Sequence, residues 1–290
     1  MKITNIGFIG GDMRIVHLIQ MYANEEYNIR VFGFEKYNFE SMENITICKE
    51  LSDVISDSDI LIGPVPFTSN YETLNAPFSA NTININDILI ETKPNQLLIC
   101  GRVDAKLQEM FHENSVRYID ILSREEFAVL NAISTSEGAL QIAMEHTNCT
   151  LHNSEVLVLG FGRIGKILCK MLDGIGAKVY CEARKFSDLA WIKAYGYTPI
   201  LLNDLEENIP KFNLFINTIP YIVFDKNKID KMHEDAIFID LASKPGGIDL
   251  DYAKEKQIKT ILGLSLPGKV APFTAANHMK ETIDNIIGEQ

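Results

Sequence analysis

A glycine-rich segment between residues 156 and 165 constrains the fold of this chain more than any other feature. The apolar run Val156-Leu-Val-Leu leads into Gly160-Phe161-Gly162-Arg163-Ile164-Gly165, and an amphipathic stretch follows from Lys166. In a strand-GxGxxG-helix unit, the first glycine makes the tight turn, the second admits the pyrophosphate and the third lets helix and strand pack closely. The segment therefore predicts a dinucleotide site, with the phosphates at the N-terminus of the helix.

The rest of the chain alternates short apolar runs with amphipathic stretches, which is typical of parallel sheets covered by helices on both faces. At 290 residues the chain has the length of two domains. The sequence thus predicts an α/β fold with two doubly wound Rossmann-like domains. The expected strands are 3–9, 29–34, 60–65, 97–100 and 116–121 in the first half, and 155–159, 178–181, 214–218, 236–241 and 260–262 in the second.

Two long helical patterns set the expected domain boundaries. Residues 124 to about 146 have helical periodicity, although the polar run 131–138 is expected to interrupt it, and residues 273–287 after Pro272 predict a terminal helix. We expect residues 1–125 and a returning C-terminal helix, 272–290, to form a substrate and catalytic domain. Residues 126–150 would form a linking helix, and residues 151–271 would form the dinucleotide-binding domain.

The end of the second strand of the dinucleotide unit indicates which cofactor is bound. An NAD enzyme usually places an acid there for the ribose 2′-hydroxyl, and counting along the strand puts Ala183 at that position. Arg184, Lys185 and Ser187 follow, and Arg163 lies in the fingerprint, so NADP is favoured. A shift of one residue would instead place Glu182 at the ribose and repel a 2′-phosphate, and the basic pair would then be the solvated start of a helix.

Two later strand ends belong to the same edge of the predicted sheet. They are Asn217-Thr218-Ile219-Pro220 and Asp240-Leu-Ala242-Ser243-Lys244-Pro-Gly-Gly247. Ligands of doubly wound folds lie at the carboxyl ends of the strands. We expect Thr218, Ile219, Pro220, Ala242 and Ser243 to border the nicotinamide half of the cofactor.

The N-terminal half contains a second glycine turn, Gly10-Gly11-Asp12-Met13-Arg14, which lacks the third glycine of a nucleotide fingerprint. A turn at a helix N-terminus binds anions, and Arg14 could clamp a carboxylate while Asp12 orients it. The alternative is an N-cap aspartate with a surface arginine.

The candidates for chemistry lie in the expected linking helix and after a cofactor-domain strand. Ser134 and Thr135 would contact substrate at a cleft between the domains, and Glu137 is the candidate proton acceptor, with a solvated glutamate as the alternative. Lys244 would pair with a substrate carboxylate or polarise an imine, unless it is a surface lysine of a turn.

Charge and composition limit the remaining possibilities. A net charge of −12 argues against nucleic acid and anionic membranes, which bind clustered Lys and Arg. No apolar run is long enough to span a bilayer. Five dispersed cysteines predict free thiols in the cytoplasm, and the six histidines form no ligand motif, so we expect no metal.

Six segments in order along the chain together resemble the A subunit of dipicolinate synthase. They are residues 9–14, 134–138, 160–165, 217–220, 241–247 and 266–272. The resemblance implies a cytoplasmic enzyme of the mother cell of a sporulating bacterium, which oxidises dihydrodipicolinate to pyridine-2,6-dicarboxylate with NADP and a flavoprotein-like B subunit. A dicarboxylate substrate would need anion partners, for which Arg14, Lys244 and the Gly10-Gly11 turn are the candidates.

Two other functions remain open, as does a homo-oligomeric state. The architecture also resembles that of D-2-hydroxyacid and alanine dehydrogenases, but the hydroxyacid reaction usually uses a histidine just after the final Rossmann strand. Residues 263–271 contain no histidine, and His278 is the next one. A non-catalytic, NADP-binding regulatory protein is the other alternative.

Overall fold

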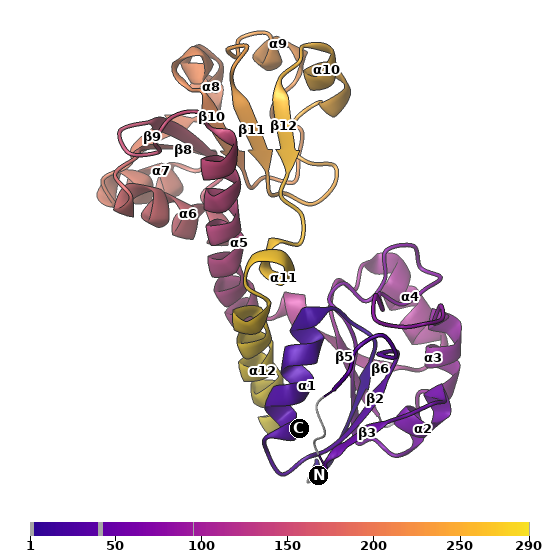
Figure 1. Cartoon of the computed structure of the whole chain (residues 1–290). Coiled ribbons are helices and arrows are strands. Elements are labelled where there is room, and N and C mark those ends of the chain that lie inside the picture. The colour runs from indigo at the N-terminus through magenta and orange to yellow at the C-terminus, as the bar shows by residue number, and fades with distance from the viewer. Residues whose placement is uncertain (1–2, 40–42, 95, 290) are drawn as a thin grey trace. The chain divides into compact units, whose positions relative to one another are not determined.

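The computed structural model describes residues 3–39, 43–94 and 96–289. The chain divides into two compact units (Figure 1): Met1–Ala128 with Ala271–Gln290 form unit 1, and Val129–Val270 form unit 2. Each unit contains a six-stranded parallel sheet with helices on both faces. The predicted α/β class with two doubly wound, Rossmann-like domains is therefore confirmed.

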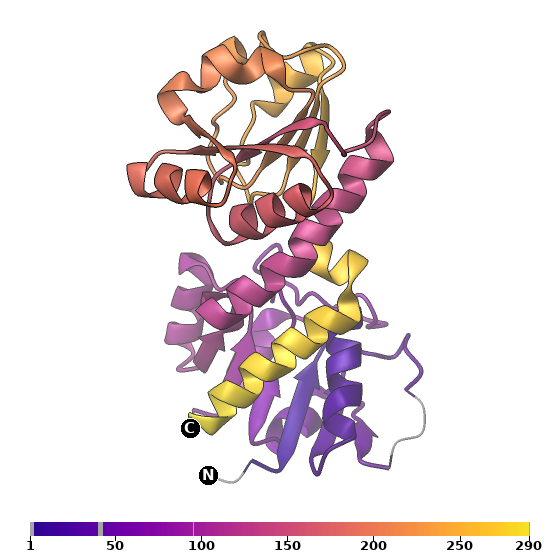
Figure 2. The same cartoon turned by 90° about the vertical axis from the view of Figure 1, so that its left-hand side faces the viewer.

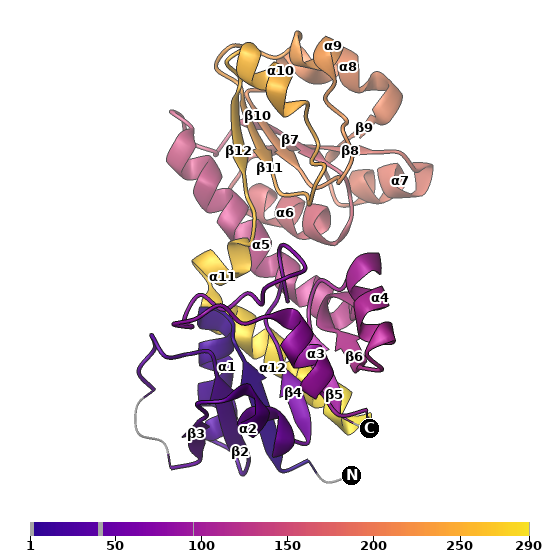
Figure 3. The same ribbon diagram turned by 90° about the vertical axis from the view of Figure 1, so that its right-hand side faces the viewer.

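The sheet of unit 1 has the strand order β3-β2-β1-β4-β5-β6. Its strands are β1 (Asn5–Ile9), β2 (Asn28–Phe32), β3 (Ile45–Ile47), β4 (Ile60–Ile62), β5 (Leu97–Cys100) and β6 (Arg117–Asp120). The helices α1 (Met13–Ala23) and α12 (Pro272–Gly288) cover one face (Figure 2), and α2 (Leu51–Ser56), α3 (Ile85–Glu91) and α4 (Ala105–Glu113) cover the other (Figure 3). Two apolar clusters, one on each face, form the core of this unit.

The C-terminal helix α12 packs against α1 within unit 1, as predicted (Figure 2). Ala276, Met279, Ile283 and Ile286 are buried in the same cluster as Ile15 and Ile19 of α1. The Tyr22 hydroxyl donates to the Asp284 carboxylate at 2.7 Å, and Arg124 binds Glu289 near the end of the helix. Apolar burial along the inner face of α12 thus fixes the last turns of the chain on the first sheet.

The sheet of unit 2 repeats this order, as β12-β11-β10-β7-β8-β9. Its strands are β7 (Glu155–Leu159), β8 (Lys178–Ala183), β9 (Thr198–Leu201), β10 (Leu214–Asn217), β11 (Ile237–Asp240) and β12 (Lys259–Leu262). One face packs on α5 (Glu125–His146), α6 (Arg163–Gly174) and α7 (Phe186–Ala194), and the other on α8 (Leu205–Asn208), α9 (Lys226–Ile229) and α10 (Leu250–Glu255). The short helix α11 (Leu266–Val270) and the 3-10 turns Ile121–Ser123, Leu202–Asp204 and Ile209–Lys211 complete the elements.

The long helix predicted from residue 124 to about 146 is confirmed as α5, and the interruption expected at residues 131–138 is wrong, because α5 runs without a break from Glu125 to His146. The polar residues stay helical since their hydroxyls bind carbonyls one turn back: Thr135 Oγ1 donates to Asn131 O at 2.9 Å and Ser136 Oγ to Ala132 O at 2.8 Å. Gly138 allows α5 to pack closely on α11, since a Cβ at this position would lie 2.9 Å from the Leu266 side chain of α11.

Two strands were not predicted, and they occupy equivalent places. β3 and β9 are the outer strands of the two sheets, each beside the strand that pairs with the central one. Two of the three residues of β3 are exposed, and Pro199 lies within β9. Edge strands pair on one side only, so a short polar strand or one that contains proline is stable there without a clear apolar pattern.

Candidate functional site

The turn between β7 and α6 has the geometry that the glycine fingerprint predicts. Gly160 has a φ of +91°, and a Cβ at Gly165 would lie 2.0 Å from the Gly160 carbonyl oxygen. Gly162, by contrast, is exposed, and a Cβ there would meet no heavy atom within 4 Å. The first and third glycines are thus required by the fold itself, and the space beside the second is open for a ligand.

The N-terminus of α6 presents backbone N–H groups at this opening. Its N-cap is Gly162, which has no side chain to cap the helix, and its first turn contains no acidic residue. The first N–H groups of a helix lack intrahelical partners and lie at the positive end of its dipole. A pyrophosphate is the type of group that such a terminus binds.

The loop after β10 lies directly against this turn. The Thr218 hydroxyl donates to the Leu159 carbonyl at 2.8 Å, and the Thr218 N–H donates to the same oxygen at 3.0 Å. A Cβ at Gly160 would lie 2.7 Å from Thr218 Oγ1 and 2.8 Å from Ile219 Cγ1. The structure therefore brings Thr218 and Ile219 beside the glycine turn, and the exposed Pro220 follows them.

A buried clamp joins the loops after β10 and β11. The Asp240 carboxylate is 1% exposed and accepts hydrogen bonds from Asn217 Nδ2 at 2.8 Å, Ala242 N at 3.1 Å and Gly247 N at 2.8 Å. The Asn217 amide also donates to Ile219 O at 2.9 Å. We call Asn217 and Asp240 the Asn–Asp clamp. Both residues were predicted at this edge of the sheet, but their contact was not.

The clamp also explains the glycine pair that ends the loop. A Cβ at Gly247 would lie 2.1 Å from Asn217 Nδ2, and one at Gly246 would lie 2.7 Å from Asp240 Oδ2. Between the clamp and these glycines, Ala242 is buried, whereas Ser243 and Lys244 are exposed. The loop therefore has a fixed base and presents the Lys244 side chain to solvent.

The end of β8 contains the most unusual electrostatic feature of unit 2. Glu182 pairs with Leu159 in the sheet and is fully buried, and neither of its carboxylate oxygens has a hydrogen-bond partner among the described residues. Burial raises the pKa of this carboxyl group to about 7, and the positive charge of Arg184 opposes that shift in part. Ala183 is the last residue of the strand, and Arg184, Lys185 and Ser187 after it are exposed.

In unit 1 the second glycine turn is closed by its own surroundings. Gly10 and Gly11 are buried, the Gly10 N–H donates to Phe32 O at 2.9 Å, and a Cβ at Gly10 would lie 2.7 Å from Ala76 Cβ. Asp12 is the N-cap of α1 and accepts from the Arg14 N–H at 3.0 Å.

Arg14 is a buried, paired cation rather than a surface arginine. It is 6% exposed, its Nε and Nη2 donate to the Asp12 carboxylate, and Nη2 also donates to the Val65 carbonyl. The predicted pairing of Asp12 with Arg14 is thus present, together with the predicted N-cap. The same ion pair uses most of the donors that would otherwise bind an anion.

The remaining candidates are distributed between the units. Ser134 and Thr135 are buried in α5, the Ser134 hydroxyl has no partner within the described part of the chain, and Glu137 is exposed. These residues and Lys244 belong to unit 2, whereas Arg14 belongs to unit 1. His278 is in α12 of unit 1, and burial lowers its pKa.

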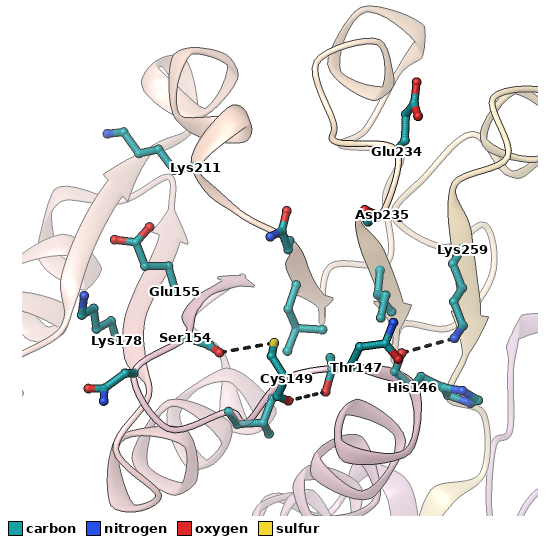
Figure 4. Close-up of a pocket in the computed structure, with 16 residues that line it drawn as sticks. His146, Thr147, Cys149, Ser154, Glu155, Lys178, Lys211, Glu234, Asp235 and Lys259 are labelled. Atoms are coloured by element: carbon teal, nitrogen blue, oxygen red, sulfur yellow. Dashed lines mark hydrogen bonds between the residues drawn. The ribbon is translucent and has the colours of Figure 1, made fainter.

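A cavity of about 800 Å³ lies at the opposite end of the unit 2 sheet (Figure 4). Its lining includes Glu155, Lys178, Leu214, Ile237 and Lys259, which are the first residues of their strands. Charges of both signs surround it, and Figure 4 shows Lys211, Lys178 and Glu234 pointing away from its centre. Because ligands of doubly wound sheets bind at the carboxyl ends of the strands, we assign the cofactor to the glycine turn and not to this cavity.

The described residues show neither a membrane span nor a metal cluster. None of their helices is both long enough and apolar enough to cross a membrane. Within residues 3–39, 43–94 and 96–289, no group of three or more His, Cys, Asp or Glu side chains is arranged to hold a metal ion.

Comparisons with known proteins agree with the two-unit division. The family model for the N-terminal domain of the dipicolinate synthase A subunit matches residues 5–122, and that for the D-isomer specific 2-hydroxyacid dehydrogenase NAD binding domain matches residues 128–245. The dipicolinate synthase A subunit of Bacillus subtilis (strain 168) is 30% identical over 98% of this chain and 96% of its own length.

Two solved structures are similar over the whole chain. The crystal structure of the dipicolinate synthase A subunit from Bacillus halodurans is 28% identical, with a TM-score of 0.90 over 99% of this chain and 98% of that one. The corresponding crystal structure from Bacillus subtilis is 29% identical, with a TM-score of 0.90 over 100% and 97%. A nicotinamide dinucleotide is accordingly the cofactor type of unit 2, and the chain has a dehydrogenase-type, oxidoreductase role.

Proposed function

The chain belongs to the family of dipicolinate synthase A subunits, and we propose that it oxidises dihydrodipicolinate to dipicolinate with NADP. The observation that carries the proposal is the open glycine turn at Gly162, with the uncapped N-terminus of α6, in a chain that matches its relative from end to end. We further propose that it acts in the cytoplasm of the mother cell of a sporulating bacterium.

The residues around the glycine turn fit a dinucleotide. The N–H groups of Gly162, Arg163 and Ile164 would bind the pyrophosphate, because a Cβ at Gly162 would meet nothing that the chain itself supplies. Thr218, Ile219, Pro220, Ala242 and Ser243 would line the nicotinamide half, at loops that the Asn–Asp clamp holds. When bound, the nicotinamide ring supplies a hydride acceptor.

The choice of NADP is supported by the charges at the end of β8. Ala183, the last strand residue, has no carboxylate to accept hydrogen bonds from a ribose 2′-hydroxyl, and Arg184, Lys185 and Ser187 follow with exposed side chains. Cations and a hydroxyl group are suitable partners for a 2′-phosphate. Glu182 is fully buried, although the charge of Arg184 still acts on its carboxyl group.

The substrate would be held through its two carboxylates. Arg14 keeps Nη1 for an anion after Nε and Nη2 have bound Asp12 and Val65, and Lys244 offers an exposed ammonium. Gly10, Gly11, Ser134 and Thr135 are the further candidate contacts, of which Ser134 has an unused buried hydroxyl. Residues 1–125 with 272–290 would thus form the substrate domain, residues 151–271 the cofactor domain and residues 126–150 their link.

The proposed reaction needs little catalytic assistance from these residues. Oxidation of a dihydropyridine removes one hydride and one proton and yields an aromatic ring, so the substrate needs little activation. Glu137 is the proposed proton acceptor, because it carries an exposed carboxylate on α5 next to Ser134 and Thr135. Asp12 acts as a positioning residue through Arg14.

The family name also implies a partner protein, and we propose that this is the flavoprotein-like B subunit of dipicolinate synthase. A D-2-hydroxyacid dehydrogenase has less support, because no histidine follows β12 before residue 278, and His278 belongs to unit 1.

The test combines freshly generated dihydrodipicolinate with NADP or NAD, and with the chain alone or the chain plus the B subunit. We expect the near-ultraviolet absorbance of reduced nicotinamide to rise with NADP, with an equal amount of pyridine-2,6-dicarboxylate by chromatography. A Gly162→Val variant controls for reduction that does not use the glycine turn. NADP binding without product in any mixture would contradict the proposal and favour a regulatory role.

A further inference from the structure

The helix α7 is unusual because it exposes nearly all of its apolar surface. Of its nine residues, all described, Ile192 alone is buried. Phe186 is 78% exposed and Trp191 56%, and Tyr195 directly after the helix is 55% exposed. Exposed single hydrophobic residues are common, but two large aromatic side chains on one helix and a third directly after it indicate a binding surface.

The aromatic residues of α7 are also ordered against one another. Trp191 stacks on Tyr195 with ring centroids 5.6 Å apart and an interplanar angle of 27°. Tyr195 in turn contacts Phe161, at 6.3 Å, and Tyr197, at 6.2 Å. Stacked, rigid aromatic rings lose little conformational entropy when a partner covers them, which is why Trp and Tyr are frequent hot spots of interfaces.

The exposed charge at α7 differs from that of the chain as a whole. The helix carries the exposed Lys193, and the exposed Arg184 and Lys185 come directly before it, against one acidic residue, the half-buried Asp188. The whole chain has a net charge of −12. We call Trp191, Lys193 and Tyr195 the α7 face, and its charge favours an acidic partner.

Unit 1 of the same chain offers such an acidic surface. This unit carries 22 Asp and Glu against 11 Lys and Arg, whereas unit 2 carries 17 against 16. Asp87 and Glu91 of α3 and Glu50 at the start of α2 lie close enough for their charges to interact: desolvation raises the pKa of Glu91, and the charges of Asp87 and Glu50 raise it further. Ile90, beside Glu91, is 73% exposed. We call Glu50, Asp87, Ile90 and Glu91 the α3 face.

We propose that the chain self-associates through contact of the α7 face of one copy with the α3 face of a second copy. Lys193 would meet Glu91 or Asp87, which repel one another without a cation, and the Trp191–Tyr195 stack would cover Ile90. The two faces are complementary in charge, and both contain exposed apolar area.

Trp191 supplies a direct probe, because it is the only tryptophan of the chain. Analytical ultracentrifugation over a dilution series would be combined with the fluorescence emission of the same samples, without substrate or cofactor. We expect a mass at least twice 32.6 kDa at high concentration. On dilution the mass should fall to that of one chain, while the emission shifts to longer wavelength as Trp191 becomes solvated.

Two pairs of variants separate this contact from other causes of association. We expect Trp191→Ala or Lys193→Glu to weaken self-association by about tenfold or more. Phe273→Ala, which removes a ring that is 57% exposed in unit 1, and Lys211→Glu, which makes the same charge change elsewhere in unit 2, should have no such effect. A mixture of Lys193→Glu chains with Glu91→Lys chains should recover association that neither shows alone.

Three results would overturn the proposal. The first is a mass of one chain at every concentration with constant emission. The second is equal weakening by the α7 variants and their matched controls. The third is an emission shift that appears only when NADP or the B subunit is added, which would assign the α7 face to the nucleotide site or to that partner. Each result leaves the proposed reaction untouched, because none of these measurements depends on turnover.

Discussion

The two sheets share one strand order and a glycine turn after the central strand, yet their carboxyl edges differ. In unit 2 Gly162 is exposed, and the N-terminus of α6 has no capping side chain. In unit 1 Gly10 and Gly11 are buried and Asp12 caps α1. The same topology therefore leaves the helix N-terminus uncapped in one unit, whereas in the other the Gly10 N–H donates to Phe32 O and the Arg14 N–H donates to Asp12.

The two edges also differ in how their buried ionisable groups are paired. Arg14 in unit 1 is bound by Asp12 and by the Val65 carbonyl, whereas the Glu182 carboxylate in unit 2 has no hydrogen-bond partner among the described residues. A paired buried charge is compatible with a stable fold, but an unpaired one favours its neutral form. The function of each unit therefore depends on the residues at the carboxyl edge of its sheet rather than on the fold that the two units share.

The largest expected effect comes from filling the open glycine position. Gly162→Val should weaken NADP binding by about a thousandfold, or ~4 kcal/mol, because the side chain takes the space of the pyrophosphate. The free energy of unfolding should change by less than about 1 kcal/mol, since Gly162 is an N-cap with negative φ. Calorimetric titration and thermal unfolding would measure the two quantities.

Gly10→Val is the matched variant in unit 1. Its Cβ would overlap Ala76 and Leu74, and Gly10 has a φ of +58°, so it should destabilise the chain without changing NADP affinity. The contrast between the two edges would be broken if Gly10→Val weakened NADP binding as much as Gly162→Val.

The next effect concerns two aspartates, each of which is the last residue of its strand. Asp240 ends β11 and accepts three hydrogen bonds, and Asp120 ends β6 and accepts hydrogen bonds from three backbone N–H groups, those of Arg102, Val103 and Leu122. Replacing either by alanine leaves donors unpaired and should lower the free energy of unfolding by about 3 kcal/mol. Asp240→Ala should also weaken NADP binding, because it releases the loops at residues 217–220 and 240–247, whereas Asp120→Ala should not. Denaturant unfolding would measure the stability of each variant, and calorimetric titration would measure its affinity for NADP.

A smaller effect, which depends on pH, is expected at Glu182. Its pKa is raised to about 7 in the folded chain from an ordinary value of 4.5. Below about pH 4.5 the group is protonated in both states and has no effect, and the folded state loses stability as pH rises through the window up to about 7. Glu182→Gln should therefore be more stable than the parent above pH 7, by about 2 kcal/mol, and equal to it below pH 4.5.

The pH dependence itself is the test at Glu182. Glu145→Gln, at an exposed glutamate of α5 that accepts a hydrogen bond from Gln141, should give a difference that does not vary with pH. A Glu182→Gln stability curve parallel to that of the parent would mean that this carboxyl group is not held neutral by burial.

The dinucleotide turn of unit 2 could be predicted from the sequence because the spacing of its glycines specifies the backbone conformation. Gly160 and Gly165 are needed wherever the backbone must turn or pack closely, so their spacing predicted the β7–α6 turn. The strands β3 and β9 were missed because edge strands need no regular apolar pattern. The polar run in α5 was misread because hydroxyl groups that usually favour turns here bind carbonyls of the preceding turn.

Contacts between distant residues could not be predicted in the same way. The Asn–Asp clamp joins positions 23 residues apart through side chains, and no local pattern specifies that pair. The closure of the Gly10-Gly11 turn depends on Leu74 and Ala76, which come from a loop more than sixty residues away. A glycine turn thus predicts a local backbone shape, and its surroundings decide whether a ligand can reach it.

The smallest expected effect tests the cofactor choice at the end of β8. Arg184 is exposed, so its charge is screened by solvent, and Arg184→Ala should weaken NADP binding by about tenfold, or ~1.4 kcal/mol, while NAD binding stays unchanged. The loss should shrink as salt concentration rises, because screening already weakens the contact in the parent. Ala183→Asp should reverse the preference by repelling a 2′-phosphate and accepting hydrogen bonds from a ribose hydroxyl. Equal losses for both cofactors in Arg184→Ala would mean that Arg184 supports the loop rather than the 2′-phosphate, and the difference between the two edges would then lie in the glycine turn alone.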